Sequence, residues 1–339
     1  MSLPESSRFQ FAEDMEICRI LNGMWQVSGG HGPIDPAAAV QDMFPYVDEG
    51  FTTWDLADHY GPAEDLIGDF RRQLTAARSP EAWKSVQAFT KWVPRPGPMT
   101  RSVVEQAVNV SLRRMGVNCL DLLQFHWWDY QDESYLDALS HLSDLRDEGK
   151  IRYLALTNFD TEHLKRITGH GIKIVSNQVQ FSLVDRRPEV EMAEFCQDQG
   201  IHVLAYGTLC GGLLSDKYLG VAEPSRAILN TASLSKYKQM VDAWGGWALF
   251  QDLLGTLKII ADRHQVNVAN VAVRYVLDRP AVAGAIVGVR LGVSEHRADT
   301  ARVFSFNLDP ADLDRIDAVL NLSKNLYQII GDCGDEYRR

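Results

Sequence analysis

The chain has 339 residues, of which 45% are hydrophobic, so it can bury either one large barrel core or the cores of two ordinary domains. Its formal net charge of −11 argues against nucleic acid or an anionic membrane surface as the main partner. The longest apolar stretch, 281–289, is too short to span a bilayer, and residues 1–18 lack the pattern of a signal peptide. We therefore expect a cytoplasmic protein without a membrane partner. Five scattered cysteines without a Cys-x-x-Cys pair indicate neither disulfide bonds nor a metal site.

Taken in chain order, short apolar runs alternate with segments of helical periodicity. The predicted strands are 16–25, 51–55, 84–91, 119–125, 151–156, 174–180, 201–206 and 285–287. The predicted helices are 36–49, 62–74, 101–115, 135–147, 162–167, 190–197, 248–263, 268–277, 294–303 and 310–320. The stretch 207–244 is rich in Gly, Ser and Tyr and weakly periodic, which indicates a functional loop over one face. The tail 323–339 has no clear pattern.

About eight strand signals alternate with helices, and no break in composition marks a second domain. The economical fold is α/β: one (β/α)₈ TIM barrel over residues 1–339, with an extra C-terminal helix and a long loop after strand 7. Barrels of this kind place their chemistry at the C-terminal ends of the strands.

Four chemically complementary side chains fall at three successive strand ends. Asp55 ends one predicted strand and Tyr60 follows it, Lys91 ends the next, and His126 ends the third. A free phenol, with a pKa of about 10, is a poor proton donor to a neutral carbonyl unless a cation lies nearby. Lys91 offers that cation, and a buried ammonium would itself need a carboxylate such as Asp55. Tyr60 is therefore the candidate acid.

Each of these residues also has an ordinary structural interpretation. Asp55 could cap a helix, Tyr60 could pack half-buried, Lys91 could be a surface cation and His126 a satisfied core histidine. Taken singly, these interpretations are the better ones. The order and spacing of the four together favour a catalytic site.

An ordered set of motifs along nearly the whole chain resembles the aldo-keto reductase family. Residues 54–61 (WDLADHYG) are similar to the family's Phe-Asp-Thr-Ala-x-x-Tyr-Gly, and Lys91 and His126 complete a tetrad. Residues 149–152 (GKIR) followed by 157–159 (TNF) are similar to Gly-Lys-x-Arg followed by Ser-Asn-Phe, with Thr157 in place of the usual serine. The match continues in the same order through residues 177–178, 205–206 and 288–290.

The resemblance implies a nicotinamide-dependent oxidoreductase that reduces an aldehyde or ketone to an alcohol, or runs the reverse oxidation. Tyr60 would protonate the carbonyl oxygen, with its pKa lowered by Lys91. Asp55 would pair with Lys91, and His126 would orient the carbonyl oxygen. The implied partner is a small-molecule carbonyl or alcohol substrate.

The resemblance also assigns the cofactor contacts. Asn158 and Gln178 would hold the nicotinamide carboxamide, and Tyr206 would stack on the ring. The remaining assigned contacts are Thr157, Gly207, Leu209, Gly211, Gly288, Arg290, His296, Asp299 and Thr300. Without the resemblance, Asn158, Gln178 and Tyr206 would be interpreted as a cap, a core amide and a packing aromatic.

The choice between NADPH and NADH depends on the segment after the last strand. Arg290 stands where the resemblance expects a cation for the adenosine 2′-phosphate, and a guanidinium can bind that dianion through two hydrogen bonds. Arg297 could approach the same region, although a solvated helix cation is its simplest interpretation. Asp299 would repel the phosphate, and His296 would be a weaker, pH-dependent cation. We expect NADPH to be preferred, with NADH possible.

Four indoles follow or flank strand ends: Trp25, Trp92, Trp127 and Trp128. Some of them are expected to wall the substrate pocket and to favour aromatic or other apolar carbonyl compounds, with Trp25, Trp92 and Trp127 as the main candidates. The competing interpretation, core or barrel-rim packing, is about equally good.

Three other functions fit parts of the sequence. Residues 30–35 (GHGPID) resemble a Rossmann dinucleotide loop but lack its third glycine. A metal-dependent barrel hydrolase could use Asp55, His59, His126 and Lys91, although the first predicted strand lacks paired histidines. Some relatives of the aldo-keto reductases are non-catalytic, redox-sensing regulatory subunits, and the intact tetrad argues against that role here.

Overall fold

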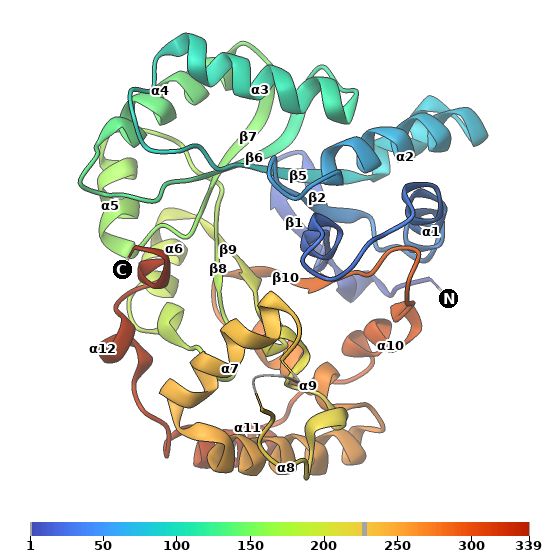
Figure 1. Cartoon of the computed structure of the whole chain (residues 1–339), viewed down its shortest axis with the longest axis vertical. Helices are drawn as coiled ribbons and strands as arrows, with labels where there is room; N and C mark the ends of the chain where they lie inside the picture. Colours follow the sequence, from blue (N-terminus) through green and yellow to red (C-terminus); the bar gives the residue numbers. More distant parts are fainter. Residues whose placement is uncertain (1, 226–228, 339) are drawn as a thin grey trace.

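A closed barrel of eight parallel strands organises the computed structural model, which describes residues 2–225 and 229–338 (Figure 1). The barrel strands are β3 (Ile20–Gly23), β4 (Thr53–Asp55), β5 (Gln87–Trp92), β6 (Leu120–His126), β7 (Ile151–Thr157), β8 (Ser176–Gln180), β9 (His202–Tyr206) and β10 (Val282–Gly288). Each strand pairs in parallel with the next, and β10 pairs with both β9 and β3, which closes the cylinder. The predicted TIM-barrel fold is confirmed.

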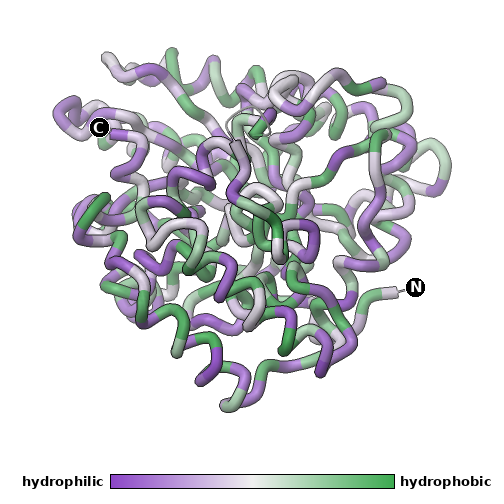
Figure 2. Tube along the Cα trace, turned by 60° about the horizontal axis from the view of Figure 1, so that its bottom comes forward, coloured by the Kyte–Doolittle hydropathy of each residue, from purple (hydrophilic) through white to green (hydrophobic). Residues whose placement is uncertain are grey.

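Helices surround this barrel (Figure 1). They are α1 (Pro36–Glu49), α2 (Ala63–Ala77), α3 (Arg101–Met115), α4 (Ser134–Asp147), α5 (Thr161–Gly169), α6 (Met192–Gln199), α7 (Ala232–Trp244), α8 (Gly246–His264), α9 (Val268–Leu277), α10 (Arg297–Ala301), α11 (Pro310–Leu320) and α12 (Leu326–Ile330). Figure 2 shows hydrophobic and hydrophilic residues alternating along the peripheral helices, as expected for helices that pack one face on a barrel. In the described part of the chain, no helix is both long and apolar enough to cross a membrane.

Local capping explains several helix boundaries. The Asp35 carboxylate accepts hydrogen bonds from the N–H groups of Ala37 and Ala38 at the start of α1, and Gly50 ends that helix with a left-handed φ of 104°. The Thr100 side chain caps α3 in the same way. The bounds of α1, α3 and α11 are the predicted ones.

An antiparallel hairpin, β1 (Arg8–Ala12) and β2 (Met15–Cys18), covers the N-terminal end of the barrel. Its residues Phe11, Met15 and Ile17 pack with Leu21 and Phe89 in a second buried cluster. The prediction of one strand over 16–25 is wrong, because the chain leaves the hairpin at Arg19 before it enters the barrel as β3. The Arg19 side chain fixes that turn by donating to the carbonyl oxygens of Leu277, Val282 and Ala283.

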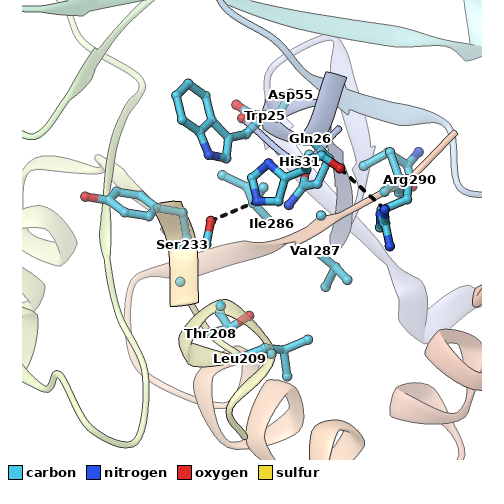
Figure 3. Close-up of a pocket in the computed structure, with 18 of the residues that line it drawn as sticks. Trp25, Gln26, His31, Asp55, Thr208, Leu209, Ser233, Ile286, Val287 and Arg290 are labelled. Atoms are coloured by element: carbon cyan, nitrogen blue, oxygen red, sulfur yellow. Dashed lines mark hydrogen bonds between the residues drawn. The ribbon is translucent and has the colours of Figure 1, made fainter. Parts of the chain in front are cut away.

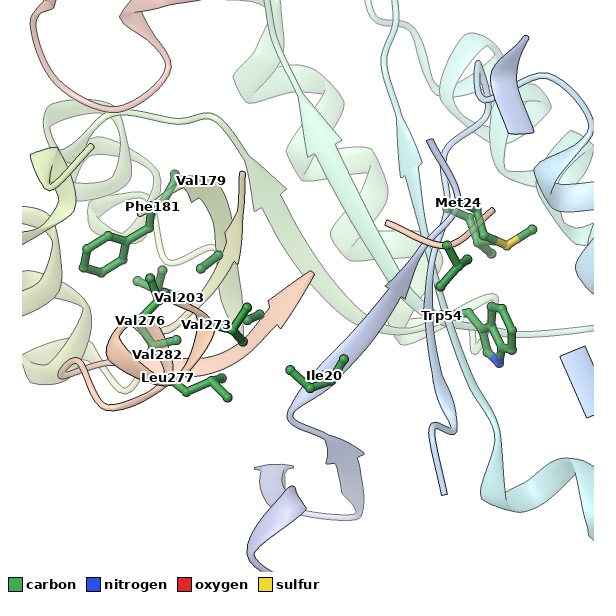
Figure 4. Close-up of a cluster of buried hydrophobic side chains, with 14 of the residues drawn as sticks. Ile20, Met24, Trp54, Val179, Phe181, Val203, Val273, Val276, Leu277 and Val282 are labelled. Atoms are coloured by element: carbon green, nitrogen blue, oxygen red, sulfur yellow. The ribbon is translucent and has the colours of Figure 1, made fainter. Parts of the chain in front are cut away.

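The main hydrophobic core lies between the barrel strands and the outer helices. Figure 4 shows part of it, with Ile20, Met24 and Trp54 at one side and Val203, Val276 and Val282 at the other. The packing of α2 on α3 is close: a Cβ on Gly68 would lie 2.2 Å from the carbonyl oxygen of Arg114. Only glycine fits there.

The predicted loop 207–244 is partly wrong. It contains short 3-10 turns at Cys210–Gly212 and Asp216–Tyr218 and the helix α7, while its residues 226–228 lie outside the described residues. The C-terminal tail is also structured, with α12 and a 3-10 turn at Asp335–Tyr337. Both segments lie over the C-terminal ends of the barrel strands, where they border the cavity described next.

Candidate active site

One cavity of about 1080 Å³ opens at the C-terminal ends of the strands. It is lined by all four candidate catalytic residues, Asp55, Tyr60, Lys91 and His126. It is also lined by all the candidate cofactor contacts: Thr157, Asn158, Gln178, Tyr206, Gly207, Leu209, Gly211, Gly288, Arg290, His296, Asp299 and Thr300. Segments from nearly every part of the chain therefore meet at one site of the size that takes a cofactor and a substrate together.

Asp55 and Lys91 form a buried ion pair at the floor of the cavity. Lys91 Nζ donates to Asp55 Oδ1 at 2.8 Å, to Asp55 Oδ2 at 2.7 Å and to the carbonyl oxygen of Leu56 at 2.8 Å. These three bonds use all three N–H donors of the ammonium. Asp55 Oδ1 also accepts from the side-chain amides of Gln124 at 3.1 Å and Gln178 at 2.7 Å. The carboxylate is thus the centre of a buried polar network.

Tyr60 lies beside this pair, with the centre of its ring 4.9 Å from Lys91 Nζ and 5.0 Å from the centre of the Trp25 indole. Burial, and then the Asp55 carboxylate, raises the pKa of the Tyr60 hydroxyl well above its usual value. The net lowering expected from Lys91 is not seen, because burial and Asp55 outweigh the effect of an ammonium that is itself paired with Asp55. The phenol is consequently protonated at neutral pH.

His126 is buried at the end of β6, and burial, followed by the Arg338 charge, lowers the pKa of its imidazole to about 3. The ring is therefore neutral at physiological pH. Its Nδ1 lies 3.1 Å from the carbonyl oxygen of Thr157, which can only accept, so this contact selects the tautomer with the proton on Nδ1. Donation by Nε2 to a substrate carbonyl would need the other tautomer, in which Nδ1 accepts from Asn158 Nδ2 at 3.4 Å.

Buried polar atoms around the cavity lack partners among the described residues. They are Gln26 Oε1, His31 Nδ1, His126 Nε2, Thr157 Oγ1 and Thr208 Oγ1. A buried polar atom normally has a hydrogen-bond partner, so such a group around one cavity fits a polar ligand. The loop after β9 adds positive-φ glycines, Gly207 and Gly211, that pack closely against Tyr237 of α7. The residues present fit a nicotinamide dinucleotide, with an amide-rich end at Asn158 and Gln178.

The other end of the cavity carries Arg290, which is exposed and makes one long hydrogen bond, 3.4 Å to the carbonyl oxygen of His31 (Figure 3). The His31 ring in turn contacts Ser233 Oγ at 3.3 Å, so the loop after β3 and the start of α7 meet across the cavity (Figure 3). Arg297 does not reach this region: it binds Asp42 and Glu49.

Two of the predicted pocket tryptophans are misplaced. Trp92 and Trp127 are buried in the core, where Trp92 packs on Phe125, with ring centres 5.4 Å apart, and Trp127 donates to two main-chain carbonyls. Trp25 and Trp128 line the cavity. Successive residues of a strand point to opposite faces, so Trp92 must point away from the cavity into which Lys91 points. The same alternation places Trp128, and not Trp127, on the side of His126.

Lys236 and Tyr337 also line the cavity and were not predicted. Lys236 is on α7, inside the stretch interpreted as a loop, and Tyr337 is in the tail without periodicity. Within the described ranges, no group of three or more His, Cys, Asp or Glu side chains is placed to hold a metal ion.

The model of the Aldo/keto reductase family matches residues 19–321 of the chain. The chain belongs to this family. Its residues after 321, including Tyr337, lie beyond the matched range.

Individual aldo-keto reductases and other relatives are distant. The chain is 32% identical over 261 residues to flagellar radial spoke protein 5 of Chlamydomonas reinhardtii. The aligned region covers 66% of this chain and 49% of that protein, so this chain spans about half the length of that relative. It is 22% identical over 321 residues to an NADH-specific methylglyoxal reductase of Escherichia coli, covering 88% and 93% of the two chains. An aldo-keto reductase of Klebsiella pneumoniae, solved in complex with NADPH, shares the fold with a TM-score of 0.70 at 21% identity, covering 94% of this chain and 96% of that one.

Proposed function

We propose that this aldo-keto reductase reduces an aldehyde or ketone with NADPH and that Tyr60 is the general acid. The observation that carries the proposal is the convergence of Tyr60, the Asp55–Lys91 pair and His126 at one end of a cavity whose other end presents glycine-rich backbone and a free arginine. A bound nicotinamide cofactor supplies the hydride that the chain itself cannot provide.

The side chains have separate tasks. Tyr60, protonated at neutral pH, donates its proton to the carbonyl oxygen as negative charge develops there, and water later returns a proton to the phenolate. The Lys91 ammonium, 4.9 Å from the Tyr60 ring, stabilises the phenolate while Asp55 keeps Lys91 charged. His126 orients the substrate oxygen by donating from Nε2, in the tautomer in which Nδ1 accepts from Asn158. In alcohol oxidation the same groups act in reverse.

Arg290 supports the choice of NADPH. Its guanidinium has no carboxylate partner in the part of the chain that the structure describes, so its donors are free for the adenosine 2′-phosphate. The nearby Asp299 carboxylate accepts from Asn267 and lies 3.8 Å from Arg302 Nη1, whose positive charge offsets part of its repulsion of a phosphate. The known relatives differ, because one is NADH-specific and another was solved with NADPH.

The test is cofactor oxidation with a panel of aldehydes and ketones, comparing wild type, Tyr60→Phe and Tyr153→Phe. Tyr60→Phe keeps the ring and removes the proton, so turnover should fall by about 100-fold or more while cofactor affinity stays within about twofold. Tyr153 is a matched control, since its hydroxyl bonds Asp14 at the N-terminal end of the barrel. Ordinary turnover by Tyr60→Phe would end the assignment.

A non-catalytic role is the alternative function, and the similarity of the chain to a flagellar radial spoke protein is the reason to test it. The intact Asp55–Lys91 pair beside Tyr60 favours turnover, because buried ionisable groups that meet in a cavity cluster at functional sites. Wild-type protein that binds the cofactor but oxidises it with no carbonyl compound in the panel would support the alternative.

A further inference from the structure

The C-terminal segment 332–338 folds back over the barrel and ends beside α5 and α6 (Figure 1). We infer that this segment completes the nicotinamide end of the site, and that Tyr337 and Lys236 position Tyr206 and Asn158 for cofactor binding. The inference rests on the proposed function, and it gives roles to Lys236 and to a tail, with Tyr337, that lies beyond the residues matched by the family model.

A chain of hydrogen bonds with one possible direction connects these residues. Asn158 Oδ1 can only accept, so Tyr206 donates to it at 2.9 Å. The Tyr206 oxygen is then free to accept from the Tyr337 hydroxyl at 3.0 Å, and the Tyr337 oxygen accepts from the Lys236 ammonium. Each hydrogen bond in the series strengthens the next one, because a hydroxyl group whose oxygen accepts a hydrogen bond from a cation becomes a stronger hydrogen-bond donor.

The consequence for Asn158 is a fixed orientation. Its Oδ1 accepts from Tyr206, and its Nδ2 lies 3.4 Å from His126 Nδ1, which accepts from it in the tautomer with the proton on Nε2. Two of the three residues proposed to contact the nicotinamide, Asn158 and Tyr206, are therefore held by one series that begins at Lys236. Lys236 also lies over the rings of Tyr206 and Tyr337, at 5.2 and 4.5 Å from their centres, and has no carboxylate partner among the described residues.

The tail holds the main chain of Asn158 as well. Asn158 has a left-handed φ of 57°, which is unusual for a residue other than glycine, and Arg338 Nη2 donates to its carbonyl oxygen at 2.7 Å. Gly334 packs on the same carbonyl so closely that a Cβ would lie 2.1 Å from it. These contacts stabilise the unusual backbone conformation at the residue proposed to bind the carboxamide.

Buried charges anchor the tail in this position. Glu336 accepts from Arg187 at 2.9 Å, and Arg187, itself 2% exposed, also binds Asp185 and the carbonyl oxygen of Asp332. The Asp332 carboxylate accepts from the main-chain N–H of Thr161 at 2.6 Å. The segment is anchored before Tyr337 by Glu336 and after it by Arg338, so it is an ordered part of the site and not a flexible terminus.

The experiment compares the binding of two probes, NADP⁺ and adenosine 2′,5′-bisphosphate, which lacks the nicotinamide. Both are titrated calorimetrically into wild type, Tyr337→Phe, Lys236→Met and the double variant. The control is Tyr327→Phe, which removes a tail hydroxyl that bonds Glu191 away from the cavity. Thermal midpoints are recorded for every variant.

Tyr337→Phe should weaken NADP⁺ by about fivefold, the cost of one hydrogen bond, and leave the bisphosphate unchanged. Lys236→Met should act in the same direction, and the double variant should be little worse than Tyr337→Phe because both changes break one series. Unchanged NADP⁺ binding, an equal loss for both probes, or tighter NADP⁺ binding, as for a tail that competes with the cofactor, would each overturn the inference and leave the proposed function intact. Failure of wild type to bind either probe would end both.

Discussion

The Asp55–Lys91 pair should be the most sensitive point of the molecule to a conservative substitution. Asp55→Asn keeps one oxygen, which can still accept from Gln124 and Gln178, but it turns the other acceptor of the Lys91 ammonium into an N–H group. Lys91 is 2% exposed and would retain only the Leu56 carbonyl and one amide oxygen. Leaving a buried charge without its partner costs about 3 to 5 kcal/mol, and the retained oxygen favours the lower end, about 3 kcal/mol.

The reverse change should cost less. In Lys91→Met the Asp55 carboxylate keeps its two amide donors, so we expect a loss of about 2 kcal/mol, and the double variant should recover about 2 kcal/mol of the summed losses. Urea unfolding of the four proteins measures the cycle, with the exposed Asp65→Asn on α2 as the control. Losses that add within about 0.5 kcal/mol would refute the argument, because independent residues would behave in that way.

Three further outcomes are expected. Arg290→Ala should lower the NADPH to NADH ratio of kcat/KM by roughly tenfold or more, the worth of a charge-assisted hydrogen bond, and equal weakening with both cofactors would contradict the role of Arg290. Carbonyl reduction needs the protonated phenol, and burial and Asp55 raise the pKa of Tyr60, so the rate of reduction should be constant from about pH 6 to 9. Alcohol oxidation needs the phenolate, so its rate should still be rising at about pH 10. A change in the rate of reduction near pH 6.5 would contradict the neutral state of His126. Trp128→Ala should raise KM for an aromatic aldehyde by several-fold more than for an aliphatic one, whereas Trp92→Phe should lower the thermal midpoint without changing this selectivity.

The pH dependence of the Asp55→Asn deficit provides an independent check of its cause. Burial lowers the pKa of Lys91, and Asp55 is the main group that raises it. Without Asp55 the pKa falls further, so the folded state binds fewer protons than the unfolded state over a wider range, and stability rises with pH in that range. The deficit of Asp55→Asn relative to wild type should therefore be largest near pH 6 and shrink toward pH 10. A deficit independent of pH would point to lost packing instead of a stranded ammonium.

Local signals in the sequence were sufficient for the fold. The bounds of α1, α3 and α11 were predictable because a capping side chain or an N-terminal proline marks each start within a few residues. The strand over 16–25 was not, because its division into β2 and β3 depends on pairing with residues distant in sequence. Strand pairing is a long-range property that periodicity alone does not reveal.

The convergence of the four candidate catalytic residues at one site could be predicted from the sequence because of the topology of the barrel. Parallel strands in a barrel all end at the same face, so polar side chains at successive strand ends must converge. The direction of the Tyr60 pKa could not be predicted in this way, because it depends on burial and on whether the Lys91 donors are already used by Asp55. The error at Trp92 and Trp127 was avoidable, since the alternation of a strand already assigns them to the face opposite Lys91 and His126.

The tail shows where sequence reasoning ends. Its anchoring residues contact partners far away in the chain: Arg338 bonds the carbonyl oxygen of Asn158 across 180 positions, and Glu336 bonds Arg187 across 149. These are bonds from single side chains, without the repeated spacing that identifies a helix or strand, and a short segment with charged residues is typical of a frayed end. The tail is held at the site by the buried Arg187, which forms one ion pair with Asp185 and a second with Glu336 of the tail. A buried arginine with more donors than local acceptors is therefore a signal that a distant acidic segment must fold back onto it.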